Sequence, residues 1–221
     1  MSSTRIRRAG RKTGPKPRFT SEDVINAAVE LGIDRFTLGA VAAKLGIATS
    51  AMYRLFDSRD ALVDACLAQA AAEIGMIMLD DELPWPELLR NWAETTWNIC
   101  EKYPGLDITI FQYTQSFSHV RGFTQHAMGI LMAQGFARSE ALFALDFIGD
   151  TVLATHIGMS AMRHSPEGMD IVRRTITELS AETLLDNKDH WNAQRGFLDA
   201  KVEFIIAGLR QQLGQRATEK T

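Results

Sequence analysis

The chain has 221 residues, with 24 Lys and Arg against 27 Asp and Glu, which gives a formal net charge of −3. Hydrophobic residues make up 46% and charged residues 23%, as in ordinary globular proteins with a sizeable core. Two cysteines, Cys66 and Cys100, cannot build a disulfide framework. Without a Cys-x-x-Cys or Cys/His cluster, the sequence predicts no metal site and no cofactor.

The charge is unevenly distributed. Residues 1–18 carry seven Arg and Lys residues and no acid, so this segment has a charge of +7 and the other 203 residues sum to −10. Because it lacks hydrophobic periodicity and contains several Gly and Pro residues, we expect a disordered basic arm. No apolar block of signal-peptide type follows, and the longest uncharged run is too short and polar to span a bilayer. We therefore expect a cytoplasmic protein without membrane contact.

Helix signals begin at Thr20, which forms a capping-box pattern with Asp23 before a helical run that stops at Gly32. Thr37 can cap a second short helix that ends at Gly46, and a third short helix follows it. Later helices are expected over about 58–79, 86–102, 106–114, 121–134, 138–163, 167–185 and 195–213, with breaks at Pro104-Gly105, Ser118, Gly135, Pro166 and 186–192. Since no segment alternates like a strand, the sequence predicts an all-α fold.

The segment from Thr37 to Phe56 has the layout of a helix-turn-helix. Ala42 is small enough for two helices to cross closely, Gly46 can adopt a left-handed turn conformation, and Ile47 can fill the angle between the helices. Any tight helix pair has these requirements, so the positions alone leave DNA binding and simple packing equally open.

The surrounding sequence resembles the TetR family of transcriptional regulators. The matching residues are Thr37, Leu38, Val41, Ala42, Gly46, Ile47, Tyr53, Phe56, Ser58, Arg59, Asp60 and Leu62. The resemblance is specific over residues 20–65 and loose beyond them. Two positions depart from it, because Ala48 replaces the usual Ser and Leu55 replaces a frequent His. Thr49 or Ser50 is expected to supply the missing helix cap.

After the basic arm at 1–18, the resemblance implies a helix-turn-helix DNA-binding domain at 19–65 and a larger helical ligand-binding and dimerisation domain at 66–221. It also implies a homodimeric repressor on a palindromic double-stranded DNA operator. A small hydrophobic or aromatic effector bound to the C-terminal domain would release it.

The same resemblance assigns the DNA contacts. Phosphates would be contacted by Thr37, Ser58 and Arg59, and the major groove or the DNA backbone by Thr49, Ser50, Ala51, Tyr53 and Arg54. Because the basic arm directly precedes this unit, we also expect its Arg11, Lys16 and Arg18 to contact DNA. Arg54 alone suits bidentate guanine readout, with a phosphate contact or a solvated charge as the alternative. Tyr53 could equally be a core residue, Phe56 is expected to be one, and a solubilising tail is the alternative for the arm.

Residues 61–221 carry 13 basic and 21 acidic residues, which does not suit DNA binding. The helices at 138–163 and 195–213 are apolar on more than one face, so they predict either burial within one subunit or a four-helix dimer interface. Effector-lining candidates are Trp92, Trp97, Phe111, Tyr113, Phe123, Met128, Met132, Phe147 and Thr151, with His119, His126 or His156 as polar groups. Ordinary core packing is the alternative for each of them.

The sequence has no Gly-x-Gly-x-x-Gly, phosphate loop, Gly-x-Ser-x-Gly or His-Glu-x-x-His motif, so we do not expect an enzyme. A constitutive DNA-binding regulator, or an activator without a small-molecule inducer, remains the alternative function.

Overall fold

A computed structural model describes residues 19–77, 81–113, 115–165, 167–183 and 194–219. These residues contain helices and connecting turns but no β-strand, so the all-α prediction is confirmed. The predicted basic arm, including Arg11, Lys16 and Arg18, lies outside them.

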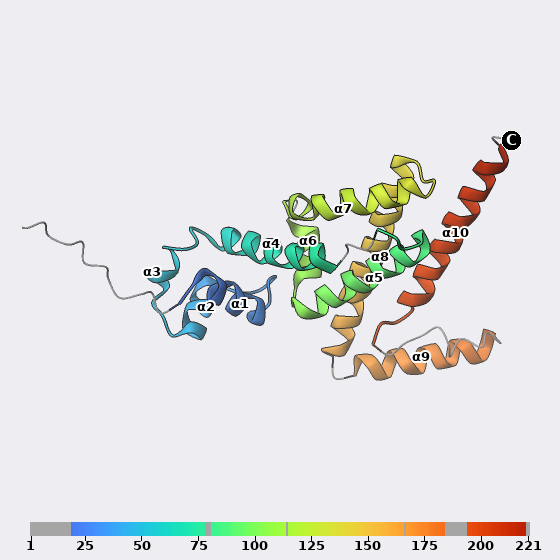
Figure 1. The fold of residues 1–221 in the computed structure, drawn as a ribbon. Coiled ribbons are helices and arrows are strands. Elements are labelled where there is room, and N and C mark those ends of the chain that lie inside the picture. Colours follow the sequence, from blue (N-terminus) through green and yellow to red (C-terminus); the bar gives the residue numbers. More distant parts are fainter. Residues whose placement is uncertain (1–18, 78–80, 114, 166, 184–193, 220–221) are drawn as a thin grey trace, which may run out of the picture.

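The helices divide into a small N-terminal unit and a larger bundle, joined by one long helix (Figure 1). In chain order they are α1 (Ser21–Leu31), α2 (Leu38–Leu45), α3 (Thr49–Met52), α4 (Arg59–Ile77), α5 (Trp85–Lys102), α6 (Leu106–Gln112), α7 (Ser116–Ala133), α8 (Arg138–Arg163), α9 (Gly168–Thr183) and α10 (Leu198–Glu219). We call α1–α3 the head and α5–α10 the body. Division of the chain into separate domains at residue 65 stays a prediction.

The local signals of the head are present in the structure. The backbone N–H of Thr20 donates to Asp23 Oδ2 at 2.7 Å, and the N–H of Asp23 donates to Thr20 Oγ1 at 3.2 Å, so the predicted capping box is confirmed. Gly46 has φ 65°, the left-handed conformation expected at the turn after α2. Ala42 is buried, which lets α1 and α2 pack closely.

One hydrophobic cluster joins the head to the body. Buried head residues such as Val41 and Met52 belong to the same cluster as Leu62 of α4, Ile99 of α5 and Leu106 of α6. The head therefore packs against the body through α4 and the α5–α6 corner.

A second cluster forms the core of the body, where α5, α7, α8 and α10 pack together. Among the described residues, α8 is long and apolar enough to cross a membrane, although 39% of its most apolar stretch is buried within the protein. The sequence predicts this helix over 138–163, but a search for uncharged runs does not single it out as a possible membrane span, because charged residues interrupt it. Ile148 and Val152 of α8 are fully buried in the cluster, as in the central helix of a bundle.

Several predicted boundaries were wrong. α7 begins at Ser116, and Ser118 and Gly122 lie inside it, although the sequence predicts a break at Ser118 and a helix start at 121. A glycine inside a helix lowers the stability of that helix by only about 1 kcal/mol relative to alanine. The packing of α7 against α4 and α8 outweighs this cost. α10 continues to Glu219, beyond the expected end at 213.

Candidate functional site

α3 is the predicted recognition helix and is held by one buried side chain. Met52 is fully buried in the hydrophobic cluster that joins the head to the body, whereas Thr49 and Ser50 are exposed and Ala51 is half-buried. Ala48 is the N-cap residue and no side chain caps the helix, so the prediction that Thr49 or Ser50 replaces the cap was wrong. The outer face of α3 is therefore free to meet a partner.

The residues after α3 separate into core and surface. Phe56 is buried with 9% exposure, which confirms the expectation that it is a core residue. Tyr53 is 53% exposed and Leu55 is 43% exposed. Arg54 is also exposed, and no described residue forms an ion pair or hydrogen bond with its guanidinium. Tyr53 and Arg54 are thus available on the same surface as Thr49 and Ser50.

Thr37 and Ser58 are helix caps with exposed hydroxyl groups. Thr37 Oγ1 accepts a hydrogen bond of 3.1 Å from the N–H of Ala40, and Ser58 Oγ accepts one of 3.1 Å from the N–H of Ala61. In both cases the hydroxyl acts as an acceptor, so its own proton remains available to an outside oxygen such as a phosphate. This geometry is compatible with the assigned phosphate contacts.

Arg59 has a different environment from the one that the resemblance implies. Its guanidinium donates to the backbone oxygens of Phe36 (3.0 Å), Ile33 (3.1 Å) and Asp34 (2.8 Å), and to the Tyr113 hydroxyl (2.9 Å). Four of its five N–H donors are consequently used inside the protein. The geometry favours a structural role and leaves one N–H for a phosphate.

The head and body also meet at the α5–α6 corner. The N–H of Ile33 donates to the Pro104 oxygen at 2.8 Å. Gly105 has φ 82°, and a Cβ at this position would lie 2.0 Å from Asp34 Oδ1, so both the backbone conformation and the close approach require glycine. α6 is therefore attached to the head near both of its ends, here and through Tyr113.

Residues 25–66 match the family model described as bacterial regulatory proteins, tetR family. This range contains the turn at Gly46, the exposed face of α3 and the cap at Ser58 described above. This stretch is therefore a TetR-family DNA-binding domain, which supports a DNA-binding transcriptional regulator and agrees with the resemblance that the motifs indicate.

Solved structures with the same fold extend the likeness over the body. TetR from Acinetobacter baumannii AYE is 21% identical, with a TM-score of 0.64, over 89% of this chain and 99% of that one. Apo ActR from Streptomyces coelicolor is 15% identical, with a TM-score of 0.65, over 91% and 100%. ActR in complex with (S)-DNPA is 15% identical, with a TM-score of 0.58, over 87% and 98%. No match was found among curated proteins.

The nine predicted effector-lining residues lie at several separate places in the body. Trp92, Trp97, Phe123 and Met128 belong to the body core or pack against it, with the Trp92 and Phe123 rings 5.4 Å apart. Phe111 and Met132 are exposed, Tyr113 bonds to Arg59, and Phe147 and Thr151 line a groove with α10. The structure does not gather these residues around one cavity, and the effector assignment stays a prediction.

Each candidate histidine is paired with an aspartate. His119 Nε2 lies 2.7 Å from Asp64 Oδ1, and His126 Nε2 lies 2.6 Å from Asp81 Oδ1. No group of His, Cys, Asp and Glu that could hold a metal lies among the residues described by the structure.

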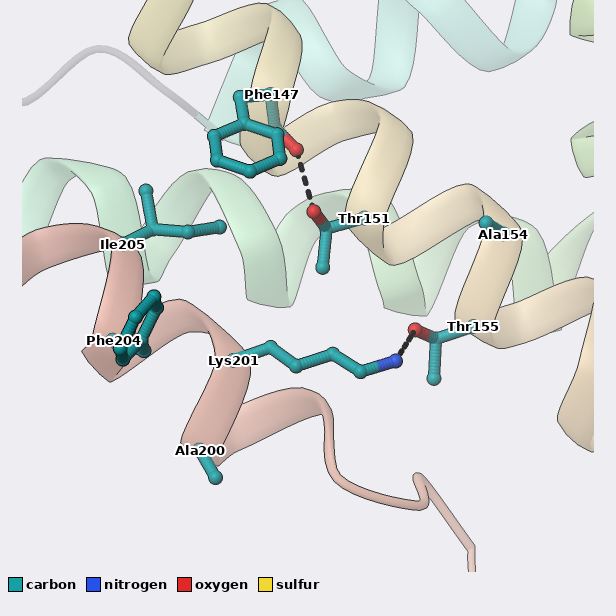
Figure 2. A pocket seen from close by; sticks show the side chains of 8 residues that line it. All are labelled: Phe147, Thr151, Ala154, Thr155, Ala200, Lys201, Phe204 and Ile205. Atoms are coloured by element: carbon teal, nitrogen blue, oxygen red, sulfur yellow. Dashed lines mark hydrogen bonds between the residues drawn. The ribbon is translucent and has the colours of Figure 1, made fainter.

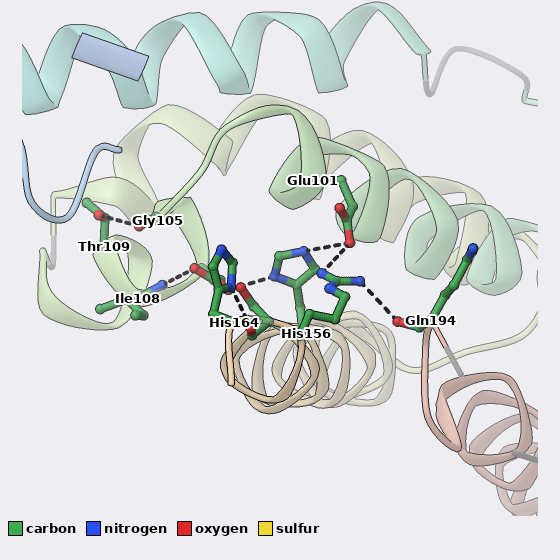
Figure 3. Close-up of polar contacts among 10 residues, drawn as sticks. Glu101, Gly105, Ile108, Thr109, His156, His164 and Gln194 are labelled. Atoms are coloured by element: carbon green, nitrogen blue, oxygen red, sulfur yellow. Dashed lines mark hydrogen bonds and ion pairs between the residues drawn. The ribbon is translucent and has the colours of Figure 1, made fainter. Parts of the chain in front are cut away.

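The third pair, His156 with Asp107, is buried at the contact of α8 with α6. His156, which Figure 3 shows beside Glu101, has its Nδ1 2.6 Å from Asp107 Oδ2. Its imidazole also packs edge-on against Trp97. Its Nε2 has no hydrogen-bond partner among the described residues, although Glu101 Oε1 lies 3.4 Å away and bonds to Arg163. This pair ties α6 to α8, a connection that sequence spacing could not indicate.

A shallow groove of about 570 Å³ runs along the outer side of α8 and α10 (Figure 2). Apolar side chains of both helices border it, including Phe147, Phe204 and Ile205. Phe204 is 81% exposed, and Phe143 lies beside Phe147 with ring centroids 5.4 Å apart. An exposed aromatic face of this kind is typical of a protein–protein interface.

Proposed function

We propose that this protein is a homodimeric, effector-responsive repressor in the cytoplasm that binds a palindromic DNA operator through α3. The observation that carries the proposal is the match of residues 25–66 together with the exposed outer face of α3. Thr49 and Ser50 would contact DNA at the start of this helix, and Ala51 offers a methyl group to thymine. Tyr53 and Arg54 follow at its end.

Dimerisation is supported by the exposed aromatic face on α8 and α10. Two copies that bury Phe143, Phe147 and Phe204 against each other would form a four-helix interface with closed two-fold symmetry. Such a dimer presents two α3 helices to one palindromic site, since half-sites about 34–36 Å apart place both helices on one side of the DNA.

The basic arm is proposed to supply most of the phosphate neutralisation. Residues 19–60 carry four basic and six acidic residues, whereas residues 1–18 carry a charge of +7. Arg11, Lys16 and Arg18 would lie along the phosphates or in the flanking minor groove. Phosphate contacts of this kind position a protein without reading sequence.

Effector control is supported by two features. ActR, which shares the fold, has been crystallised with the small molecule (S)-DNPA. In this chain, the buried Trp92 Nε1 has no hydrogen-bond partner among the described residues, so a bound acceptor near α5 and α8 would satisfy it. A ligand changes DNA affinity only if it binds the two arrangements of the head unequally.

The test compares binding of the purified protein to DNA from upstream of its own gene with binding to random DNA. We expect a preference that Arg54→Gln reduces roughly fivefold to 150-fold if Arg54 reads a guanine. Arg173→Gln in α9 makes the same charge change on an exposed residue of the body and should leave the preference intact. Equal affinity of the unaltered protein for both DNAs would refute the proposal.

The arm is tested separately, by deleting residues 2–17 and measuring affinity against salt concentration. Each phosphate contact steepens the slope of log affinity against log salt by about 0.9. We expect the deletion to flatten this slope and to weaken binding to all DNA sequences alike. An unchanged slope would show that the arm is only a solubilising tail.

A further inference from the structure

A second groove in the body, between α7 and α8, combines apolar walls with two arginines. We call it the α7–α8 groove, and its volume is about 630 Å³. Phe117 and Leu142 line it and are 64% and 51% exposed, and exposed apolar side chains that share one groove are typical of a ligand-binding surface. Arg121 of α7 and Arg138 of α8 line the same space.

Neither arginine is neutralised by a neighbouring residue. No ion pair or hydrogen bond joins the guanidinium of Arg121 or Arg138 to any residue that the structure describes. This contrasts with Arg90, Arg163 and Arg195 of the body, each of which pairs with a glutamate. Two unpaired guanidinium groups around one apolar space produce a local positive potential in a body of net negative charge.

The start of α8 faces the same groove, and the Glu140 carboxylate already lies beside its first backbone N–H groups. Its N-cap residue is Ala137, which has no side chain able to accept a hydrogen bond, and the Glu140 carboxylate accepts from the N–H of Ala137 at 2.7 Å. The first backbone N–H groups of a helix have no acceptor within the helix, and the helix dipole favours an anion beside them. Arg138 and Ser139 stand at this end of α8 and face the groove.

The bottom of the groove connects to the aromatic core. Met128 lines the groove and is only 8% exposed, because it belongs to the cluster that contains Trp92 and has Phe123 packed against it. A flexible thioether above aromatic rings can adapt its shape to an apolar guest. A molecule in the groove would thus contact the packing between α7, α5 and α8.

We propose that the α7–α8 groove binds a small anionic amphipathic molecule, such as a carboxylate carried on an aromatic ring system or an acyl chain. The acid group would pair with Arg121 and Arg138, since guanidinium and carboxylate groups match in charge and planar geometry. The apolar part would cover Phe117, Leu142 and Met128. As the chemical class of effector, this inference rests on the proposed regulatory function, but binding itself does not.

The test uses two fluorescent probes that share an aromatic skeleton, 1-anilinonaphthalene-8-sulfonate and its neutral counterpart N-phenyl-1-naphthylamine. Both are titrated into the full chain without DNA. We expect the sulfonate to bind tightly, with one site per chain, and to be displaced by decanoate but not by decylammonium. The double variant Arg121→Gln/Arg138→Gln should weaken sulfonate binding by about tenfold or more, because it removes both charge-assisted pairs. It should change binding of the neutral probe less than twofold.

Arg173→Gln/Arg174→Gln is the matched control, because it removes the same two charges from α9 and leaves the groove unchanged. Sulfonate affinity that is the same in the groove variant and the unaltered protein overturns the proposal, as does equal loss of both probes. No saturable binding to the unaltered protein, as expected if a second copy covers the groove, overturns it as well. If the unaltered protein binds the sulfonate but shows no preference for its own upstream DNA, the proposed regulatory function is rejected and the ligand site is not.

Discussion

The guanidinium of Arg59, at the start of α4, donates a hydrogen bond of 2.9 Å to the hydroxyl of Tyr113, immediately after α6. The same hydroxyl donates to Asp60 Oδ1 at 2.9 Å. Because Arg59 also bonds to three backbone oxygens between Ile33 and Phe36, one side chain holds the head, α4 and α6 together. A displacement of α6 would therefore act on the segment that precedes α2.

Tyr113→Phe removes the hydroxyl while it keeps the ring. We expect a loss of about 1–2 kcal/mol in the free energy of unfolding, because the guanidinium of Arg59 and the carboxylate of Asp60 both lose a hydrogen bond. Urea denaturation followed by circular dichroism measures this. Tyr53→Phe removes an exposed hydroxyl and serves as the control, with an expected change below about 0.5 kcal/mol. Equal free energies of unfolding for the two variants would contradict a stabilising role of the hydrogen bonds that Tyr113 makes with Arg59 and Asp60.

The buried His156–Asp107 pair should contribute more to the free energy of unfolding than the exposed His126–Asp81 pair. Asp107→Ala leaves a buried imidazole Nδ1 without a partner, and we expect a loss of about 1–3 kcal/mol in unfolding free energy. Asp107→Asn retains a polar partner and should lose less. Asp81→Ala breaks the exposed pair with His126 and should cost at most about 1 kcal/mol. Equal losses for Asp107→Ala and Asp81→Ala would contradict the buried role.

The two cysteines should be unreactive and should couple stability to alkaline pH. Burial raises the pKa of the Cys66 thiol to about 12, and burial raises the pKa of Cys100 further, with an added effect of Asp107 and Glu101. In the unfolded chain a thiol ionises near pH ~8.5, so the unfolded state loses protons first as pH rises.

Stability from these thiols is therefore fully present below pH ~8.5 and decreases as the pH rises toward the folded pKa values. Each thiol can contribute a slope of up to about 1.4 kcal/mol per pH unit between about pH 9 and 12. Urea midpoints measured from pH 7 to 10 should decline, and Cys66→Ala/Cys100→Ala should decline less steeply. At pH 8, iodoacetamide should label the native protein much more slowly than the urea-unfolded chain. Rapid native labelling would show that the thiols are accessible.

Phe204→Glu should disrupt the proposed dimer. This side chain is 81% exposed in the single chain, so a charge there is tolerated by the fold but would be buried without a partner between two copies. We expect sedimentation velocity to give a dimer for the unaltered protein and a monomer for this variant. Phe111→Glu places the same charge at another exposed phenylalanine, on α6, and should stay dimeric. Dimers in all three samples would exclude this face as the interface.

The sequence by itself determined the helices of the head and the family. The Thr20–Asp23 capping box and the left-handed Gly46 depend on neighbours close in the chain, so their residue types indicate their roles. Element boundaries were less predictable where packing overrides local preference, as at Gly122 inside α7.

Only the tertiary structure decided which groups the long side chains contact, both in the body and where the head meets the body. Arg59 matched a phosphate-binding pattern, yet its guanidinium faces backbone oxygens that a separate turn brings within reach. No sequence pattern singles out Arg121 and Arg138, because the groove that they share exists only once α7 and α8 are packed together. Local spacing fixes which residues share a helix face, whereas the direction of helix packing fixes what that face meets.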